Sequence, residues 1–114
     1  MKKFKKTILI DLDGVLNTYT GAYDETSIPP IKEGAFEFIK ELSEIYKIVL
    51  FTSRNLLLAS EWVINNNLKE YVNNVTNVKE PSFLLIDDRA INFDGDYKKI
   101  KEQIIDFQPW YKKL

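Results

Sequence analysis

Short apolar runs alternate with stretches of helical periodicity along this chain of 114 residues. Residues 7–12, 47–52 and 83–87 are predicted to be buried strands, and a weaker strand is expected between Val72 and Val78. Strands that alternate with helices form βαβ units, in which the strands are parallel and helices cover the sheet. The order of elements therefore predicts an α/β fold, a three-layer α/β/α sandwich whose central strand is residues 7–12.

Three segments have helical character. Between residues 33 and 46 apolar side chains recur at three-residue steps, which predicts an amphipathic helix. Asn55 is expected to cap a second helix, and the two asparagines at 66–67 are expected to end it in a left-handed turn. A last helix is expected at residues 97–105. The stretch up to Pro30 contains glycine, threonine and tyrosine and is expected to be a loop.

The composition restricts both the architecture and the chemistry. With 45% hydrophobic and 13% aromatic residues, residues 1–114 suit one domain with a core of its own. The chain has no cysteine and no histidine, which excludes disulfides, thiolate or imidazole catalysis and the usual zinc sites. Chemistry must therefore rest on carboxylates, hydroxyls, lysine and arginine.

Neither the net charge of the chain nor its hydropathy indicates a nucleic-acid or membrane partner. Sixteen basic and seventeen acidic residues leave a net charge of -1, so no nucleic-acid or anionic-membrane surface is expected. The opening "MKKFKK" has the charge of a signal-peptide start, but the apolar run after it is too short. No apolar stretch approaches the roughly 20 residues of a membrane span. We therefore expect a cytoplasmic protein.

Polar side chains follow three of the expected strands. These are Asp11 and Asp13 after the first, Thr52, Ser53 and Arg54 after the second, and Asp87 and Asp88 after the third. The carboxyl ends of parallel strands meet at one edge of a sheet, where such folds bind ligands. Carboxylates crowded at one edge repel each other and need a cation. With oxygen ligands only, Mg²⁺ is the expected cation.

Four motifs in this order resemble the haloacid dehalogenase (HAD) superfamily of aspartate-nucleophile phosphatases. They are "DLDGVL" after the first apolar run, "LFTSR", a lysine at Lys79, and "LLIDDR". The resemblance covers about residues 7 to 95 and is strongest to small bacterial and phage members. It implies a Rossmann-like fold and the Mg²⁺-dependent hydrolysis of a phosphomonoester through an aspartyl-phosphate.

The resemblance also implies a role for each matching residue. Asp11 would be the nucleophile and Asp13 the general acid and base, with the backbone carbonyl of Asp13 on the metal. Thr52 would bind the phosphate with its hydroxyl and the amides that follow it, at Ser53 and Arg54. Lys79 would neutralise charge between nucleophile and phosphate. The metal ligands would come from Asp11, Asp13, Asp87 and Asp88.

Structural roles compete with these assignments. Thr52 and Ser53 could cap the next helix, and Lys79 could be a surface lysine. Asn17, Arg89 and Asp94 are expected to be loop, ion-pair and turn residues, and the tail "FQPWYKK" is expected to pack rather than to recognise a ligand. For the whole chain, two alternatives to an enzyme stay open: a catalytically silent HAD-fold binding protein and a receiver-like phospho-acceptor domain.

The superfamily's cap domains have no room here. Residues 14–30 suffice only for a loop, and residues 54–79 are used by one helix and one weak strand. We therefore expect an open site whose specificity comes from Asn17, Tyr19 and Tyr23 or from a second subunit. The substrate stays unidentified, with a nucleic acid possible only as a substrate, and the chain is expected to be a monomer or a homodimer.

Overall fold

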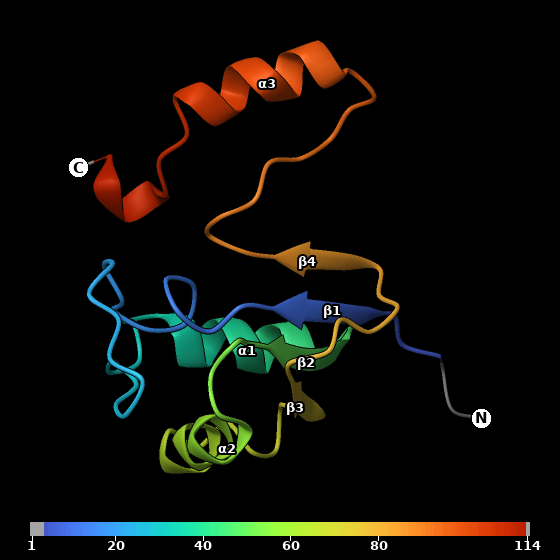
Figure 1. Ribbon diagram of the computed structural model, residues 1–114. Coiled ribbons are helices and arrows are strands. Elements are labelled where there is room, and N and C mark those ends of the chain that lie inside the picture. The colour runs from blue at the N-terminus through green and yellow to red at the C-terminus, as the bar shows by residue number, and fades with distance from the viewer. Residues whose placement is uncertain (1–3, 114) are drawn as a thin grey trace.

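The computed structural model describes residues 4–113 and contains four strands and three α-helices in this range (Figure 1). The strands are β1 (Thr7–Ile10), β2 (Lys47–Phe51), β3 (Asn74–Thr76) and β4 (Leu84–Ile86), and the helices are α1 (Ala35–Ser43), α2 (Leu56–Asn65), α3 (Tyr97–Ile105) and the short 3₁₀ helix η1 (Trp110–Lys112). Residues 1–3 of the basic N-terminal stretch lie outside this range. Every expected helix and strand is present, and most are shorter than predicted by one to a few residues at their ends.

The four strands form one parallel sheet in the order β3-β2-β1-β4. Ile8 lies opposite Ile48 on one side and Leu84 on the other, so β1 is the central strand, as predicted. The amide of Asp11 extends the ladder beyond β1 by donating to the carbonyl of Ile86 at 2.8 Å. This bond brings the first acidic residue beside the end of β4.

Helices α1 and α2 connect β1 to β2 and β2 to β3, and their apolar faces pack on the sheet. The core contains alternate strand residues together with buried helix residues, namely Ile8, Ile10, Ile48, Leu50, Ala35, Ile39, Ala59, Trp62 and Val63. Two crossovers that run in the same direction place both helices on the same face, because such crossovers are right-handed. Figure 1 shows α1 behind the strands.

The connection from β3 to β4, residues 77–83, returns across the sheet without a helix. It must pass β2 and β1, since β3 and β4 form opposite edges. A right-handed crossover in this direction runs over the face opposite α1, and in Figure 1 the segment passes in front of the strands. This face is thus crossed by an irregular segment.

Helix α3 is capped at its N-terminus but contributes no side chain to the core. Asp96 caps it by accepting hydrogen bonds from the amides of Lys98 and Lys99, but the helix has no buried residue. Among residues 4–113 it packs against no other helix or strand, and in Figure 1 it lies beyond β4. The α/β fold with a parallel sheet is therefore confirmed, while the three-layer arrangement stays a prediction. None of the helices described is long and apolar enough to cross a membrane.

The packing of α1 on the sheet predicts how much stability is lost when its central buried side chain is truncated. Ile39 is fully buried against the sheet, so Ile39→Ala should lower the free energy of unfolding by about 2–5 kcal/mol. The control is Ile64→Ala, because Ile64 also lies in a helix but is exposed and should change stability by no more than about 0.5 kcal/mol. Urea unfolding measures both, and equal effects would contradict this packing.

Candidate active site

The polar residues that follow β1, β2 and β4 line one cavity of about 370 Å³. The lining consists of these strand-end residues and five others, namely Asp11, Asp13, Thr52, Ser53, Asp87 and Asp88 together with Tyr19, Tyr23, Phe51, Asn77 and Arg89. The cavity lies at the carboxyl edge of the parallel sheet, where ligands bind in this fold class.

Three carboxylates form the acidic centre of the cavity. One oxygen each from Asp11, Asp87 and Asp88 lie within 4.8 Å of one another. The pKa of Asp11 is raised to about 8, mainly by burial and in addition by a side-chain hydrogen bond with Asp88 and by the charges of Asp87 and Asp88. Such a cluster is costly unless a proton or a cation compensates the charge.

A buried oxygen of Asp88 indicates that a cation, rather than a proton, suits the site. Asp88 Oδ2 is buried and has no hydrogen-bond partner among the described residues. Buried carboxylate oxygens are normally paired or bound to a metal. The donor set therefore fits a hard divalent cation, for which several carboxylate oxygens and water are the usual ligands.

Asp87 is held by the turn that follows β4. Its Oδ1 accepts a hydrogen bond from the amide of Arg89 at 2.8 Å. Burial raises the pKa of Asp87, and this backbone hydrogen bond acts in the opposite direction. The turn leaves the second oxygen of Asp87 for a ligand and brings Asp88 and Arg89 to the cavity.

Gly14 makes room for Asp88. Its φ is +81°, which side chains disfavour, and a Cβ at this position would collide with the Asp88 carboxylate and lie 3.0 Å from the Tyr111 ring. The glycine in the first motif is therefore required both by its backbone conformation and by the close approach of the acidic pair.

Asp13 is bound by a buried arginine. Arg54 Nε donates to Asp13 Oδ2 at 2.8 Å and its Nη2 donates to Oδ1 at 3.0 Å, in a two-pronged ion pair. Asn17 Nδ2 donates a third hydrogen bond, to Oδ1 at 3.0 Å. A carboxylate has about four acceptor positions, so one position on Asp13 is left for a group in the cavity.

The same arginine holds the flap loop, which we define as residues 14–30. Arg54 Nη1 donates to the carbonyls of Asp24 and Ser27, and its guanidinium lies 4.5 Å from the centre of the Tyr23 ring. The loop is also closed at its base, where Asn17 and Ile31 form an antiparallel bridge. The flap loop is thus attached to the sheet edge through Arg54.

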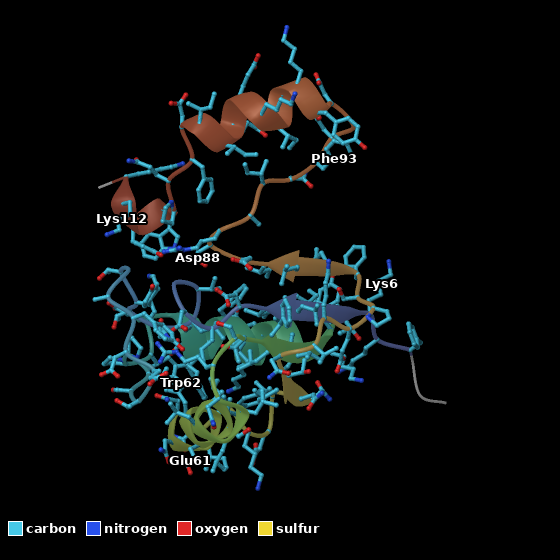
Figure 2. All side chains as sticks on the ribbon, in the orientation of Figure 1. Lys6, Glu61, Trp62, Asp88, Phe93 and Lys112 are labelled. Carbon is cyan, nitrogen blue, oxygen red and sulfur yellow. The ribbon has the colours of Figure 1, made fainter. Side chains whose placement is uncertain are left out.

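The C-terminal segment contacts residues that border the site. Trp110 Nε1 donates to the carbonyl of Gly14 at 2.7 Å, and the hydroxyl of Tyr111 accepts from Arg89 Nη2 at 3.3 Å. Tyr111 is buried and packs edge-on against Tyr19 at 6.0 Å. In Figure 2, Asp88 lies between the end of β4 and the segment that carries Lys112.

Most of the predicted site residues are brought together. Asp11, Asp13, Thr52, Ser53, Asp87 and Asp88 line the cavity, as do Tyr19 and Tyr23 of the flap loop. Asn55 caps α2 by accepting from the amide of Leu58 at 3.1 Å, so the alternative in which Thr52 or Ser53 caps this helix is wrong. Thr52 Oγ1 instead accepts from the amide of Arg54 at 3.1 Å.

Three predicted residues are placed elsewhere. The side chain of Arg54 is buried behind Asp13 rather than lining the cavity, and its amide faces Thr52. Lys79 lies exposed on the connection 77–83 and does not line the cavity. Asn17 is buried, and its Oδ1 accepts from the amides of Gly14 and Tyr19, so it shapes the flap loop rather than facing a substrate.

Sequence reasoning missed the place of Arg89 in the site. Arg89 was expected to be an ion-pair residue, yet it lines the cavity and has no ion pair among residues 4–113, while the tail packs as predicted, with Tyr111 buried and in contact with Arg89. The aromatic residues of "FQPWYKK" were a signal, but their partners lie some 90 residues earlier, for example Gly14 for Trp110. Asp94 Oδ1 accepts from the amide of Asp96 at 3.3 Å, which agrees with the predicted turn role, and its other oxygen pairs with Lys99 at 2.6 Å.

Comparison with known proteins adds information on the fold. No protein-family model and no curated protein matches the sequence. A solved structure of a conserved protein from Bacteroides thetaiotaomicron is similar, with a TM-score of 0.60 and 22% sequence identity over 90% of this chain and 91% of that one. At this identity the similarity concerns the fold alone.

The raised pKa of Asp11 predicts how stability depends on pH without divalent cations. The folded protein holds this proton up to a pH of about 8, whereas the unfolded chain releases it near 3.8. Unfolding therefore releases a proton between these values, and stability should fall as pH rises from about 4 to about 8. Urea unfolding in EDTA should show a smaller fall for Asp11→Asn, and Asp106→Asn, outside the cavity, is the control. If stability fell equally with pH in Asp11→Asn and in wild type, the raised pKa of Asp11 would be contradicted.

The buried ion pair predicts a large structural effect. Arg54→Gln leaves Asp13 without its two-pronged partner and frees the flap loop, so the free energy of unfolding should fall by about 3–5 kcal/mol. Lys99→Gln is the control, because it breaks an ion pair whose side chains are about half exposed and should cost no more than about 1 kcal/mol. Comparable small losses in urea unfolding would show that the Arg54 pair does not hold the loop.

Proposed function

We propose that this protein is a Mg²⁺-dependent phosphomonoester hydrolase of the HAD type, with Asp11 as the nucleophile. One observation carries the proposal: three separate strands of a parallel sheet deliver Asp11, Asp13, Thr52, Asp87 and Asp88 to a single cavity. Each of these residues has the role that the motif resemblance assigns to it. The finer fold assignment, a three-layer HAD sandwich without a cap domain, belongs to the same proposal.

The first chemical step uses Asp11 and Asp13. A carboxylate oxygen of Asp11 attacks phosphorus, the new O–P bond forms, and the bond from phosphorus to the leaving oxygen breaks. Asp13 enters this step protonated at the position that Arg54 and Asn17 leave free, and it gives that proton to the leaving oxygen as the product alcohol departs. The hydroxyl of Thr52 accepts a hydrogen bond from the amide of Arg54, so its own proton can be donated to a phosphate oxygen.

The second step returns the enzyme to its starting state. Water attacks phosphorus, Asp13 takes a proton from this water, and the bond between phosphorus and Asp11 breaks, which releases inorganic phosphate. The free acceptor position on Asp13 is where this proton is received, while Arg54 and Asn17 hold the carboxylate in place.

The carboxylates of the cavity would hold a cation beside the reacting groups. Asp11, Asp87 and Asp88 are the carboxylates that would hold Mg²⁺, and the backbone carbonyl of Asp13 is a further ligand implied by the resemblance. When bound, Mg²⁺ compensates the charge of the carboxylates and polarises a phosphate oxygen. The unpaired oxygen of Asp88 supports this assignment.

Hydrolysis of p-nitrophenyl phosphate tests the proposal. Activity should require Mg²⁺ and vanish with EDTA, Asp11→Asn should abolish it, and Asp13→Asn should lower kcat by about 10² to 10⁴. Asp106→Asn is the control for the loss of an exposed carboxylate and should retain activity.

The alternatives predict different outcomes. Full activity in Asp11→Asn would overturn the mechanism. Mg²⁺-induced stabilisation without hydrolysis of any phosphorylated metabolite, nucleotide or nucleic-acid end would favour a catalytically silent binding protein. A stable phosphoryl group on Asp11 after incubation with acetyl phosphate would favour a receiver-like acceptor.

A further inference from the structure

The cavity contains a cationic residue that the motif resemblance does not assign. Among the residues of the described range that line it, Arg89 is the single lysine or arginine. Arg54 lies behind Asp13 with its side chain buried, and Lys79 is exposed on another segment. Arg89 is therefore the cationic side chain that the described residues place at this cavity.

Arg89 is an exposed residue that is paired with none of the aspartates that line the cavity. Its guanidinium forms no ion pair within 4.0 Å among residues 4–113, although four aspartates line the same cavity. Its hydrogen bond to a side chain is the one from Nη2 to the hydroxyl of Tyr111 at 3.3 Å. Of the five N–H donors of an arginine, most thus stay available to a ligand.

Arg89 is aimed by two fixed contacts. Its backbone amide is held by Asp87 Oδ1 at 2.8 Å, directly beside the acidic centre. Its guanidinium is held by Tyr111, which is buried against Gly14 and Tyr19. Trp110 secures this segment through its hydrogen bond to the carbonyl of Gly14. The C-terminal segment therefore holds the guanidinium of Arg89 through Tyr111, and Tyr111 itself lies against the loop of the first motif.

We propose that Arg89 binds the phosphate group of the substrate, with Tyr111 as the positioning residue. The proposal rests on the proposed phosphohydrolase function. A phosphate that approaches Asp11 brings about two negative charges to a site rich in carboxylates, so a cation from the protein is needed beside the metal. The planar fork of arginine can donate to two phosphate oxygens at once. This role is the one that the motif order assigns to Lys79.

The experiment measures phosphate binding and turnover separately. Binding of inorganic phosphate in the presence of Mg²⁺ is measured by calorimetry, and KM and kcat are measured with p-nitrophenyl phosphate. Arg89→Gln should weaken phosphate binding and raise KM by roughly tenfold to 100-fold, as expected for lost charge-assisted hydrogen bonds. Arg89→Lys should recover part of this loss, since lysine retains the charge but not the fork.

Three further variants separate the alternatives. Tyr111→Phe removes only the hydroxyl and should raise KM by roughly threefold while kcat is maintained, an effect smaller than that of Arg89→Gln. Lys79→Gln should affect phosphate binding less than Arg89→Gln. Lys101→Gln, on the exposed helix α3, is the control for the loss of one positive charge. Thermal stabilisation by Mg²⁺ should be the same in Arg89→Gln and wild type.

Each outcome is decisive for one proposal or both. If Arg89→Gln binds phosphate as wild type does, or if it also loses stabilisation by Mg²⁺, the role of Arg89 is overturned, and turnover by wild type would still support the proposed function. If wild type binds phosphate through Arg89 without turnover, the binding role stands and the hydrolase proposal fails. If wild type binds no inorganic phosphate, the inference about Arg89 is overturned.

Discussion

The buried ion pair between Arg54 and Asp13 is the contact on which the arrangement of the site depends. Arg54 follows β2 and Asp13 follows β1, so the pair links the carboxyl ends of two neighbouring strands. The same guanidinium binds two carbonyls of the flap loop. An arginine with a buried side chain must have its donors satisfied, and here this requirement fixes the position of the acid/base candidate and of the loop beside it.

The carboxylates of Asp11, Asp87 and Asp88 have the opposite energetic character. They repel each other, one of their oxygens has no partner within the described residues, and the pKa of Asp11 is raised. Arg54 and Asp13 thus stabilise the edge of the sheet, and the three carboxylates destabilise it until a cation is bound. Functional sites commonly retain such locally unfavourable groups, because the ligand compensates them.

The C-terminal segment supports the cavity from behind, through residues that neighbour or line it. Trp110 and Tyr111 contact the loop of the first motif and the arginine after β4. Helix α3, in contrast, contacts none of the other described helices or strands, so η1 and not α3 connects this part of the chain to the loops that follow β1 and β4. Residues beyond the expected motifs therefore contribute to the environment of the acidic centre.

The sequence alone was sufficient for the parallel sheet, its central strand and the cluster of Asp11, Asp13, Thr52, Asp87 and Asp88. These features follow from local periodicity and from the rule that parallel strands share a carboxyl edge. Tertiary structure decided the roles of the cationic residues: Arg54 is buried behind Asp13, Lys79 is outside the cavity, and Arg89 lines it. The direction of a long side chain depends on contacts between segments far apart in the chain, such as Arg89 with Tyr111, and no local pattern encodes these contacts.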